Sequence, residues 1–206
     1  MQPAVIAKLL QPFLEQAPDA ALLQSISTYI DILQRWNARV NLTAIRDPEE
    51  IVTRHFGESL FAARHLFPSH DTRKTVADIG SGAGFPGIPL KLWAPEIQLT
   101  LIESSHKKAT FLREAVRALT LTGIDIQNTR AESITTRFDL VTLRAVERFS
   151  EVLPVAASLV APDGRLAILI GESQLSEAKA ILPNHLWSPA VPIPQSVSRI
   201  LAICKS

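Results

Sequence analysis

The sequence predicts an α/β fold in which a mostly parallel sheet carries helices on both faces and follows an N-terminal helical appendage. From Thr75 onward, apolar runs that suit buried strands alternate with helical patterns, which is typical of parallel sheets. Residues 1–70 carry only helical periodicity. The polar stretch His70–Lys74 lies between the two patterns, so we expect an appendage over residues 1–70 and a second domain over residues 71–206.

Composition restricts the class of protein. The chain has 206 residues, 47% of them hydrophobic, and a formal net charge of +1. A charge this small does not by itself indicate nucleic-acid binding, so any RNA contact needs a local basic patch. No apolar run reaches the roughly 18–20 residues of a membrane span, and no signal peptide is visible at Met1. With Cys204 as the single cysteine, these features predict a cytoplasmic protein without disulfides or a thiolate metal cluster.

The first long helix of the appendage is expected to begin at Asp19, a good capping residue, and its apolar face runs to Val40. Arg35 and Arg39 lie four residues apart on the opposite side of this helix. They therefore face either solvent or a partner, and the sequence favours neither alternative over the other for this pair.

A second helix is expected to begin at Asp47–Pro48, because aspartate caps helices and proline suits their first turn. This helix carries Arg54 and His55. Together with Arg35 and Arg39 they form the candidate RNA-binding set, in a basic cluster that also includes Arg46. For His55, a structural or RNA-facing role is favoured over a catalytic one.

A glycine-rich loop follows the first predicted strand, Val76–Ile79, and contains Gly80, Gly82 and Gly84. Glycine tolerates positive φ and lets a ligand lie against the main chain, and a strand, glycine loop and helix in succession present N–H groups to an anion. The next apolar run, 97–102, ends in Glu103, where a nucleoside cofactor needs an acceptor for its ribose hydroxyls. We therefore predict a nucleoside-cofactor site that includes Gly80, Gly82 and Glu103.

The loop alone fits more than one cofactor. The spacing Gly82-x-Gly84-x-x-Gly87 fits a dinucleotide loop, whereas Asp78-x-Gly80-x-Gly82-x-Gly84 fits the loop of S-adenosylmethionine (SAM) enzymes. The Asp78 carboxylate would repel a pyrophosphate, but SAM carries an ammonium and a carboxylate, so an acid beside free N–H groups suits both ends. This favours SAM, with a purely structural glycine turn as the other alternative.

The remaining elements follow in order. A helix is expected from Ser104 or Ser105 to about Thr122, with Gly123 as its stop. Further strands are expected at 124–127, 138–143 and 165–170, the last after a turn at 162–164, and a final hairpin at 187–193 and 199–204.

Ligands of open α/β sheets bind beyond the carboxyl ends of the strands. The residues that follow four successive predicted strands should therefore meet in one crevice: Gly80, Glu103, Ala131–Glu132 and Arg144. Glu132 could accept a hydrogen bond from the adenine amine, with the Ala131 backbone near the ring. Arg144 could bind a carboxylate or phosphate or form a salt bridge, and Phe85 could close over the cofactor or anchor the loop in the core.

Five segments together resemble one known family: Trp36–Ile45, Arg54–Leu60, Asp78–Leu90, Arg130–Glu132 and Leu143–Val146. This is the glucose-inhibited division protein B family, the bacterial 16S ribosomal RNA guanine-N7 methyltransferases. The resemblance covers nearly the whole chain. It implies a Rossmann-like class I SAM-dependent methyltransferase with a seven-stranded, mostly parallel sheet. It also implies 16S ribosomal RNA, or a small-subunit assembly intermediate, as the partner.

By motif match, the SAM contacts of the family fall on Gly80, Phe85, Ala131, Glu132 and Arg144, and Glu103 matches the ribose-binding acid of the wider superfamily. The chain departs from the family pattern at two positions. Many members have aspartate where Glu58 stands, and lysine where Ile170 precedes Gly171. Because that lysine is missing, we do not expect the same RNA contacts at this spot.

The implied chemistry needs few catalytic groups. Guanine N7 has an in-plane lone pair and no proton, so its methylation requires alignment and a dry site rather than a general base, and only Arg144 is a candidate catalytic residue. Cys204 lies in a late strand, away from the strand ends, so a cysteine nucleophile is not expected. The histidines lack metal-ligand spacing, so we expect no metal, and we expect a monomer.

Other functions remain open from the sequence. The nearest enzymatic alternative is a SAM-dependent methyltransferase of small molecules, because the predicted cofactor site does not define the acceptor. An NAD-dependent oxidoreductase would fit the dinucleotide spacing of the loop. A SAM-binding module without catalysis would keep the site and lose the reaction.

Overall fold

The computed structural model describes residues 1–70 and 73–205. Residues 71 and 72, inside the predicted boundary at 70–74, lie outside the described residues. The helical segments are α1 (Pro3–Leu10), α2 (Ala20–Asn37), α3 (Pro48–Glu50), η1 (Ile51–Gly57), α4 (Glu58–Leu66), α5 (Gly87–Trp93), α6 (His106–Ala118), η2 (Ala131–Ser133), α7 (Phe149–Ser158), η3 (Glu172–Gln174) and α8 (Leu175–Ile181). Among the described residues, no helix is both long enough and apolar enough to cross a membrane.

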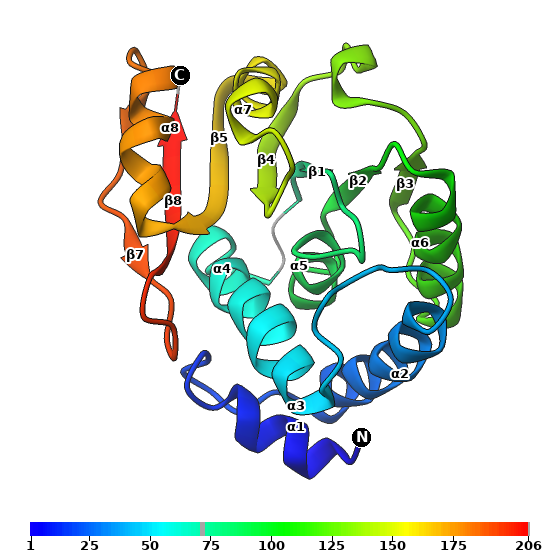
Figure 1. The fold of residues 1–206 in the computed structure, drawn as a ribbon. Helices are drawn as coiled ribbons and strands as arrows, with labels where there is room; N and C mark the ends of the chain where they lie inside the picture. Colours follow the sequence, from blue (N-terminus) through cyan, green and yellow to red (C-terminus); the bar gives the residue numbers. More distant parts are fainter. Residues whose placement is uncertain (71–72, 206) are drawn as a thin grey trace.

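The strands form one sheet with the order β3-β2-β1-β4-β5-β8-β6, and β7 pairs with β8 (Figure 1). Strands β1 to β5 run parallel, whereas β8 is antiparallel to β5. The bounds are β1 (Thr75–Ile79), β2 (Gln98–Ile102), β3 (Ile124–Gln127), β4 (Phe138–Arg144), β5 (Val160–Gly171), β6 (Leu186–Trp187), β7 (Val191–Pro192) and β8 (Arg199–Lys205). The predicted α/β class and mostly parallel sheet are confirmed.

The end of the sheet differs from the expected final hairpin. The strand predicted at 187–193 is split into β6 and β7, which pair with separate parts of β8. The break contains Pro189, which has no N–H for a sheet ladder. The described part of the chain therefore has an eight-stranded sheet in place of seven continuous strands.

Two other boundaries also differ. The turn expected at 162–164 is an irregularity inside β5, with a register shift opposite Phe138 and Leu140 and a positive φ of 64° at Asp163. Helix α6 ends at Ala118, about one turn before the predicted end, and Ser105 makes no side-chain cap.

The caps predicted in the appendage are confirmed. The Asp19 carboxylate accepts a hydrogen bond from Leu22 N–H at 2.7 Å, and the Asp47 carboxylate accepts one from Glu50 N–H at 2.9 Å. After α3 the helix widens into the seven-residue π-helix η1 before continuing as α4. Wide turns of this kind occur frequently at functional sites, and η1 carries two of the candidate residues, Arg54 and His55.

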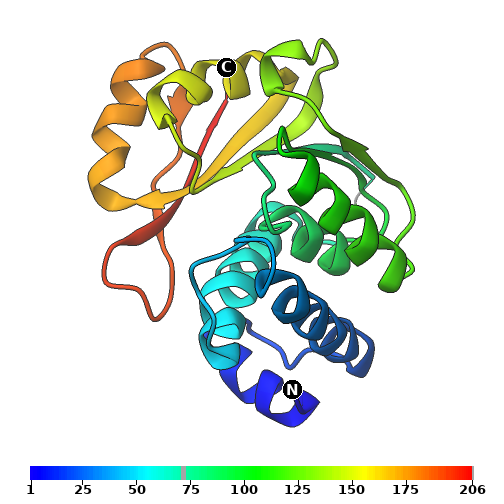
Figure 2. The ribbon, with the colours of Figure 1, turned by 45° about the vertical axis from the view of Figure 1, so that its right-hand side comes forward.

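Helices cover both faces of the sheet. One apolar cluster joins α5 and α6 to the appendage, and a second joins α7 and α8 to the opposite sheet face. Neighbouring residues of β1 fall in different clusters, Val76 in the first and Ala77 in the second, because side chains alternate along a strand. Figure 2 shows the appendage helices, blue to cyan, against α5 and α6 in green.

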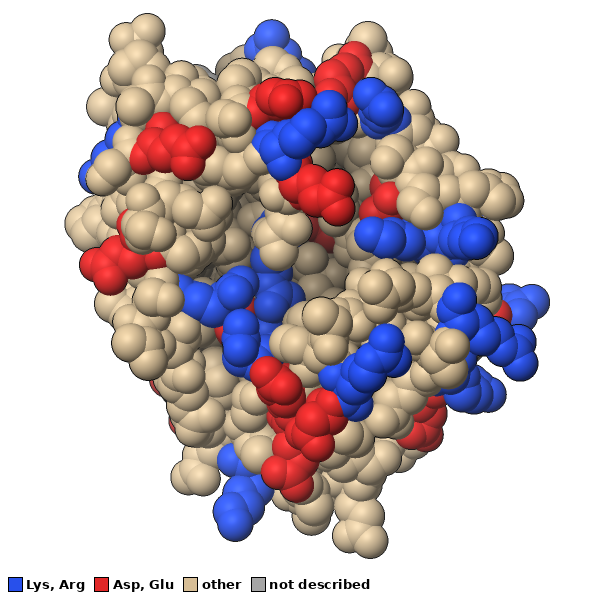
Figure 3. Space-filling view, in the orientation of Figure 1, with Lys and Arg blue, Asp and Glu red and all other residues tan. Residues whose placement is uncertain are grey.

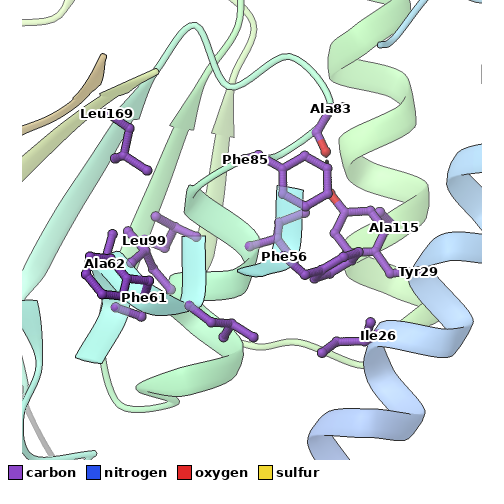
Figure 4. Close-up of a cluster of buried hydrophobic side chains, with 14 of the residues drawn as sticks. Ile26, Tyr29, Phe56, Phe61, Ala62, Ala83, Phe85, Leu99, Ala115 and Leu169 are labelled. Carbon is purple, nitrogen blue, oxygen red and sulfur yellow. Dashed lines mark hydrogen bonds between the residues drawn. The ribbon is translucent and has the colours of Figure 1, made fainter. Parts of the chain in front are cut away.

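Aromatic side chains fix the appendage to the glycine loop. The Tyr29 ring of α2 stacks on Phe85 with centroids 5.5 Å apart, and Phe56 of η1 meets Phe85 edge-on at 5.1 Å. Figure 4 shows these three rings together, with the dashed hydrogen bond from Tyr29 to Ala83. The appendage therefore shares a hydrophobic core with the sheet domain, so the two parts are packed together rather than merely linked.

Candidate functional site

A cavity of about 390 Å³ lies at the carboxyl ends of the parallel strands. Its lining brings together Gly80, Glu103, Ala131 and Glu132, which follow β1, β2 and β3. Figure 3 shows the hollow near the middle of this face, with Lys, Arg, Asp and Glu side chains on its rim. Four of the predicted residues thus share one cavity, while Gly82, Phe85 and Arg144 lie outside its lining.

The loop after β1 needs its glycines. Gly80, Gly82 and Gly84 have φ values of +65°, +55° and +81°, a region that other L-residues rarely adopt. A Cβ on Gly80 would also lie 2.9 Å from Val146 Cγ1. Gly80 therefore keeps the floor of the cavity open where the β1 and β4 ends meet.

Glu103 connects this loop to the end of β2. Its Oε2 accepts a hydrogen bond from Gly82 N–H at 2.9 Å, and its Oε1 accepts one from Ser105 N–H at 2.7 Å. The side chain is buried, although it still lines the cavity. Gly82 thus helps to orient the Glu103 side chain that lines the cavity. Both oxygens of this carboxylate are held in place by backbone N–H groups without a ligand.

Residues after β3 complete the same wall. The side chain of Asn128 donates hydrogen bonds to Glu103 O at 2.9 Å and Ser104 O at 3.2 Å. These bonds tie the loop after β3 to the end of β2. The same loop leads into η2, which carries Ala131 and Glu132. Glu132 is exposed, so its carboxylate remains available to a ligand.

Asp78 has a role different from the expected one. Its carboxylate is fully buried; it accepts hydrogen bonds from Gly87 N–H at 3.2 Å and from the Thr142 hydroxyl at 2.8 Å. Burial raises the pKa of this carboxyl to about 6, against the lowering effect of its hydrogen bonds. The sequence suggested only that an acid at this position suits SAM; the Asp78 carboxylate lies in the core, where it joins β1 to β4 and to the start of α5.

Arg144 also points away from the cavity. Its guanidinium donates to Arg54 O at 2.6 Å and to Glu58 Oε2 at 3.0 Å, and it is buried. The adjacent Ala145 lines the cavity instead. The salt-bridge alternative is therefore the one seen, and contact between Arg144 and a cofactor stays a prediction.

Glu58 is the centre of a buried charge cluster. Its carboxylate lies within 3.2 Å of guanidinium nitrogens of Arg54, Arg144 and Arg199, which come from η1, β4 and β8. Burial lowers the pKa of Arg144 to about 10, still well above neutral pH, so the cluster keeps an excess of positive charge. The Nε of Arg144 is buried without a hydrogen-bond partner.

Phe85 and His55 form a stacked pair beneath the loop. Their ring centroids are 4.7 Å apart, and the His55 Nε2 lies 2.8 Å from the Thr43 hydroxyl. Burial, followed by the charges of nearby arginines, lowers the pKa of His55 to about 3. Phe85 thus anchors the loop in the core, and His55 is neutral near pH 7, which weakens it as a candidate for binding phosphate.

The other candidate RNA-binding residues lie on the appendage surface. Arg35 and Arg39 are exposed on and just after α2, and Arg46 is exposed before α3. Arg54 is half-exposed but forms ion pairs with Glu50 and Glu58. Arg35 and Arg39 are therefore the freer cations of the predicted set.

Several residues of this region were not predicted from the sequence. Lys108 and Arg130 line the cavity, as does the loop Ala145–Arg148. Positive φ values of 49° at Ala145 and 54° at Arg148 mark this loop as strained, a property concentrated at functional sites. Hydrophobic periodicity does not identify a loop of this kind. Its position directly after β4 is the sequence signal that could have indicated it.

Cys204 fits its predicted structural role. It lies in β8, is buried, and has a pKa raised to about 12 by burial. Among residues 1–70 and 73–205, no group of three or more His, Cys, Asp or Glu side chains could hold a metal ion.

Comparison with known proteins identifies the family. The family described as "rRNA small subunit methyltransferase G" (GidB) matches residues 22–187. The chain belongs to this family. A relative named ribosomal RNA small subunit methyltransferase G from Stenotrophomonas maltophilia (strain K279a) is 42% identical over 170 residues, which cover 82% of this chain and 78% of the relative. A relative of the same name from Xylella fastidiosa (strain M23) is 40% identical over 175 residues, 84% of this chain and 80% of the relative.

Solved structures support the fold of this rRNA small subunit methyltransferase G family member. Magnesium protoporphyrin IX methyltransferase from Synechocystis PCC 6803, solved with bound SAM, matches with a TM-score of 0.67 and 17% identity, covering 94% of this chain and 100% of that protein. Ribosomal protein L11 methylase from Lactobacillus delbrueckii subsp. bulgaricus matches with a TM-score of 0.61 and 20% identity, covering 73% and 77%. The predicted Rossmann-like methyltransferase fold is confirmed.

Proposed function

We propose that this chain transfers the methyl group of SAM to N7 of a single guanine in 16S ribosomal RNA. The observation that supports this most strongly is the shared cavity of Gly80, Glu103 and Glu132 in a member of the rRNA small subunit methyltransferase G family. A family of this name acts on small-subunit RNA, and the cavity lies where α/β sheets bind their ligands.

The residues of the cavity fit SAM. Glu103 has both oxygens oriented by backbone N–H groups and retains acceptor capacity for the ribose hydroxyls. Glu132 would accept from the adenine amine beside the Ala131 backbone, and the open floor at Gly80 would receive the methionine end. The cavity volume, about 390 Å³, is in the range of small-molecule sites.

The protein contributes binding and alignment to the reaction. SAM, when bound, supplies an activated methyl group. Guanine N7 already carries a free lone pair and no proton, so no side chain has to remove one. The chain would hold the two reactants in line, at the roughly 3–3.5 Å that such a transfer needs. The buried side chains of Ile79 and Ile102 in the cavity wall would limit access of water. Arg144 acts as a positioning residue, because it joins β4 to η1 next to the loop Ala145–Arg148.

The RNA is proposed to contact the appendage. Arg35 and Arg39 offer exposed cations on α2, and contacts to phosphates supply most of the affinity of such interactions. Bases that proteins read in RNA come mostly from loops and unstacked regions, so the target guanine belongs to such a region. We further propose that the enzyme acts in the cytoplasm as a monomer, on 16S RNA or an assembly intermediate, and without a metal ion.

Mapping N7-methylguanine in 16S RNA tests this function. RNA from cells with and without the gene is compared by cleavage at methylated guanines, and we expect one modified guanine to lose its mark when the gene is absent. A gene encoding Glu103→Ala should fail to restore the mark, whereas one encoding the exposed control Lys179→Ala should restore it. Unchanged methylation in the deletion strain would contradict the proposal. Titration with SAM and NAD checks the cofactor: binding of NAD alone would favour an oxidoreductase.

A further inference from the structure

A second, smaller cavity lies beside the first, over the ends of β4 and β5. Its volume is about 120 Å³, suited to one planar heterocycle rather than a whole cofactor. The two cavities share Ala145 and Val146 in their linings. The two cavities are therefore neighbours, and this short stretch of the strained loop after β4 borders both of them.

The walls of the small cavity are apolar on one side and polar on the other. The side chains of Phe149, Ile170 and Val146 supply flat and branched apolar surface, and Gln174 and Arg199 supply polar groups. The lining of this cavity is more polar than apolar, and a few convergent polar groups of this kind fix the orientation of a ligand in small-molecule sites. Ile170 is apolar and buried, so it adds no charge to this cavity.

The strand pairing places the polar groups. Gly171 at the end of β5 pairs directly with Arg199 at the start of β8, so Arg199 is held at the same end of the sheet as the reaction site. The Nε of Arg199 lies 3.0 Å from the buried carboxylate of Glu58, an ion pair that lacks hydrogen-bond geometry. Among the described residues the terminal nitrogens of this guanidinium have no hydrogen-bond partner, so they can donate to a ligand. The Gln174 Oε1 accepts from Gly171 N–H at 3.2 Å, so its Nε2 remains a donor.

From this arrangement we infer that the small cavity holds the target guanine, with its ring against Phe149 and its O6 facing the donors of Arg199 and Gln174. This inference rests on the proposed function and assigns its acceptor subsite. Guanine presents O6 beside N7 on one edge, and arginine is the commonest partner of that edge. Adenine carries an amine in place of O6, so two donors facing this position reject it.

Base analogues at the target position test the inference directly. RNA containing the mapped target loop is prepared with guanine, inosine or 2-aminopurine at that position; inosine keeps O6 and N7, whereas 2-aminopurine keeps N7 and loses O6. We expect the wild-type protein to methylate the inosine RNA within a few-fold of the guanine RNA. It should methylate the 2-aminopurine RNA at least tenfold more slowly in kcat/KM, as the loss of a paired base contact predicts.

Two variants that remove the proposed donors connect this preference to the cavity. Gln174→Ala and Arg199→Lys should each reduce the ratio of inosine to 2-aminopurine methylation several-fold, while SAM affinity, measured by titration, stays unchanged. The control Ser176→Ala, on the exposed surface of α8, should leave the ratio as in the wild type. A structural defect would lower both rates together, so the ratio isolates recognition of O6.

The outcomes separate this inference from the proposed function. Methylation of the guanine RNA with equal rates on inosine and 2-aminopurine would overturn the O6 contact and leave the methyltransferase function standing. A wild-type preference that persists in both variants would place recognition outside this cavity. Absence of methylation on any RNA, including RNA in small-subunit particles, would reject the proposed function and the inference with it.

Discussion

The Tyr29 hydroxyl donates a hydrogen bond to the Ala83 carbonyl, across 54 residues of sequence and from the appendage to the glycine loop. The Tyr29 ring also stacks on Phe85 of the same loop. Burial, together with the negative charge of Asp78, raises the pKa of Tyr29 well above its ordinary value, so the hydroxyl stays protonated and can donate. The predicted cofactor loop is thus shaped partly by a helix outside the sheet domain.

Tyr29→Phe should therefore weaken both stability and cofactor binding. The substitution keeps the stacked ring but leaves a buried carbonyl without its donor, which costs about 1–2 kcal/mol in the free energy of unfolding. We expect SAM affinity to fall as well, because the loop loses a constraint.

Urea denaturation and SAM titration measure the two effects of Tyr29→Phe. Ser158→Ala is the control, since it removes an exposed hydroxyl-to-carbonyl bond in α7. Equal changes in the two variants would contradict a specific role for Tyr29.

Glu58→Gln should be the most destabilising single change in the charge cluster. The neutral side chain would leave Arg144 and Arg199 without a counter-charge in a buried place, and breaking such a pair costs about 3–5 kcal/mol. Glu58→Asp keeps the charge and should cost less.

The matched control for Glu58 is Glu151→Gln, which breaks the exposed pair with Arg148. We expect it to change the free energy of unfolding by less than about 1 kcal/mol. If Glu58→Gln were as mild as this control, the cluster would contribute little to the fold.

The pH dependence of stability should reveal the buried carboxyl of Asp78. Its pKa is about 6 in the folded protein, compared with an ordinary value of 3.8, so the folded state binds the proton more tightly. The tighter proton binding contributes fully to the free energy of unfolding below pH 3.8, and this contribution disappears as the pH rises through 6. The change in the free energy of unfolding is about 3 kcal/mol. His55, with a lowered pKa, acts in the opposite direction over an overlapping range, so the wild-type curve alone is not diagnostic.

Asp78→Asn isolates this effect, because an amide can accept from Gly87 N–H and donate to the Thr142 hydroxyl. Free energies of unfolding are measured for both proteins from pH 3.5 to 7.5. Relative to the wild type, the variant should gain stability as the pH rises. A difference between the two proteins that does not vary with pH would show that Asp78 titrates normally.

Reversing the charges of Arg35 and Arg39 together to glutamate should weaken RNA binding without altering SAM affinity. Each lost phosphate contact reduces the salt dependence of RNA affinity by about one unit of slope. Binding is measured at several salt concentrations. Reversal of Arg137 and Lys179, both exposed, makes the same change in net charge. If that control lowered RNA affinity equally, the effect would be one of total charge rather than of the α2 surface.

The sequence predicted those parts of the site that local pattern determines. Gly80 and Glu103 were found because each follows a short apolar strand, and the carboxyl ends of parallel strands necessarily lie on one edge of the sheet. The caps at Asp19 and Asp47 were found for the same reason, since their bonding partners are three residues away.

The direction of a side chain could not be predicted when its partner is distant in sequence. Arg144 turns away from the cavity because Glu58, 86 residues earlier, lies buried beneath it. Asp78 points inward because Thr142 and Gly87 offer donors to it. The shared wall at Ala145 and Val146 arises only when the β4 and β5 ends lie side by side, so no sequence pattern shows it.

The structure of the protein bound to S-adenosyl-L-homocysteine would show whether the large cavity is the cofactor site. We expect the ribose at Glu103, the adenine beside Ala131 and Glu132, and the sulfur facing the wall formed by Ala145 and Val146. A nucleoside bound elsewhere, or a sulfur turned away from that wall, would contradict it.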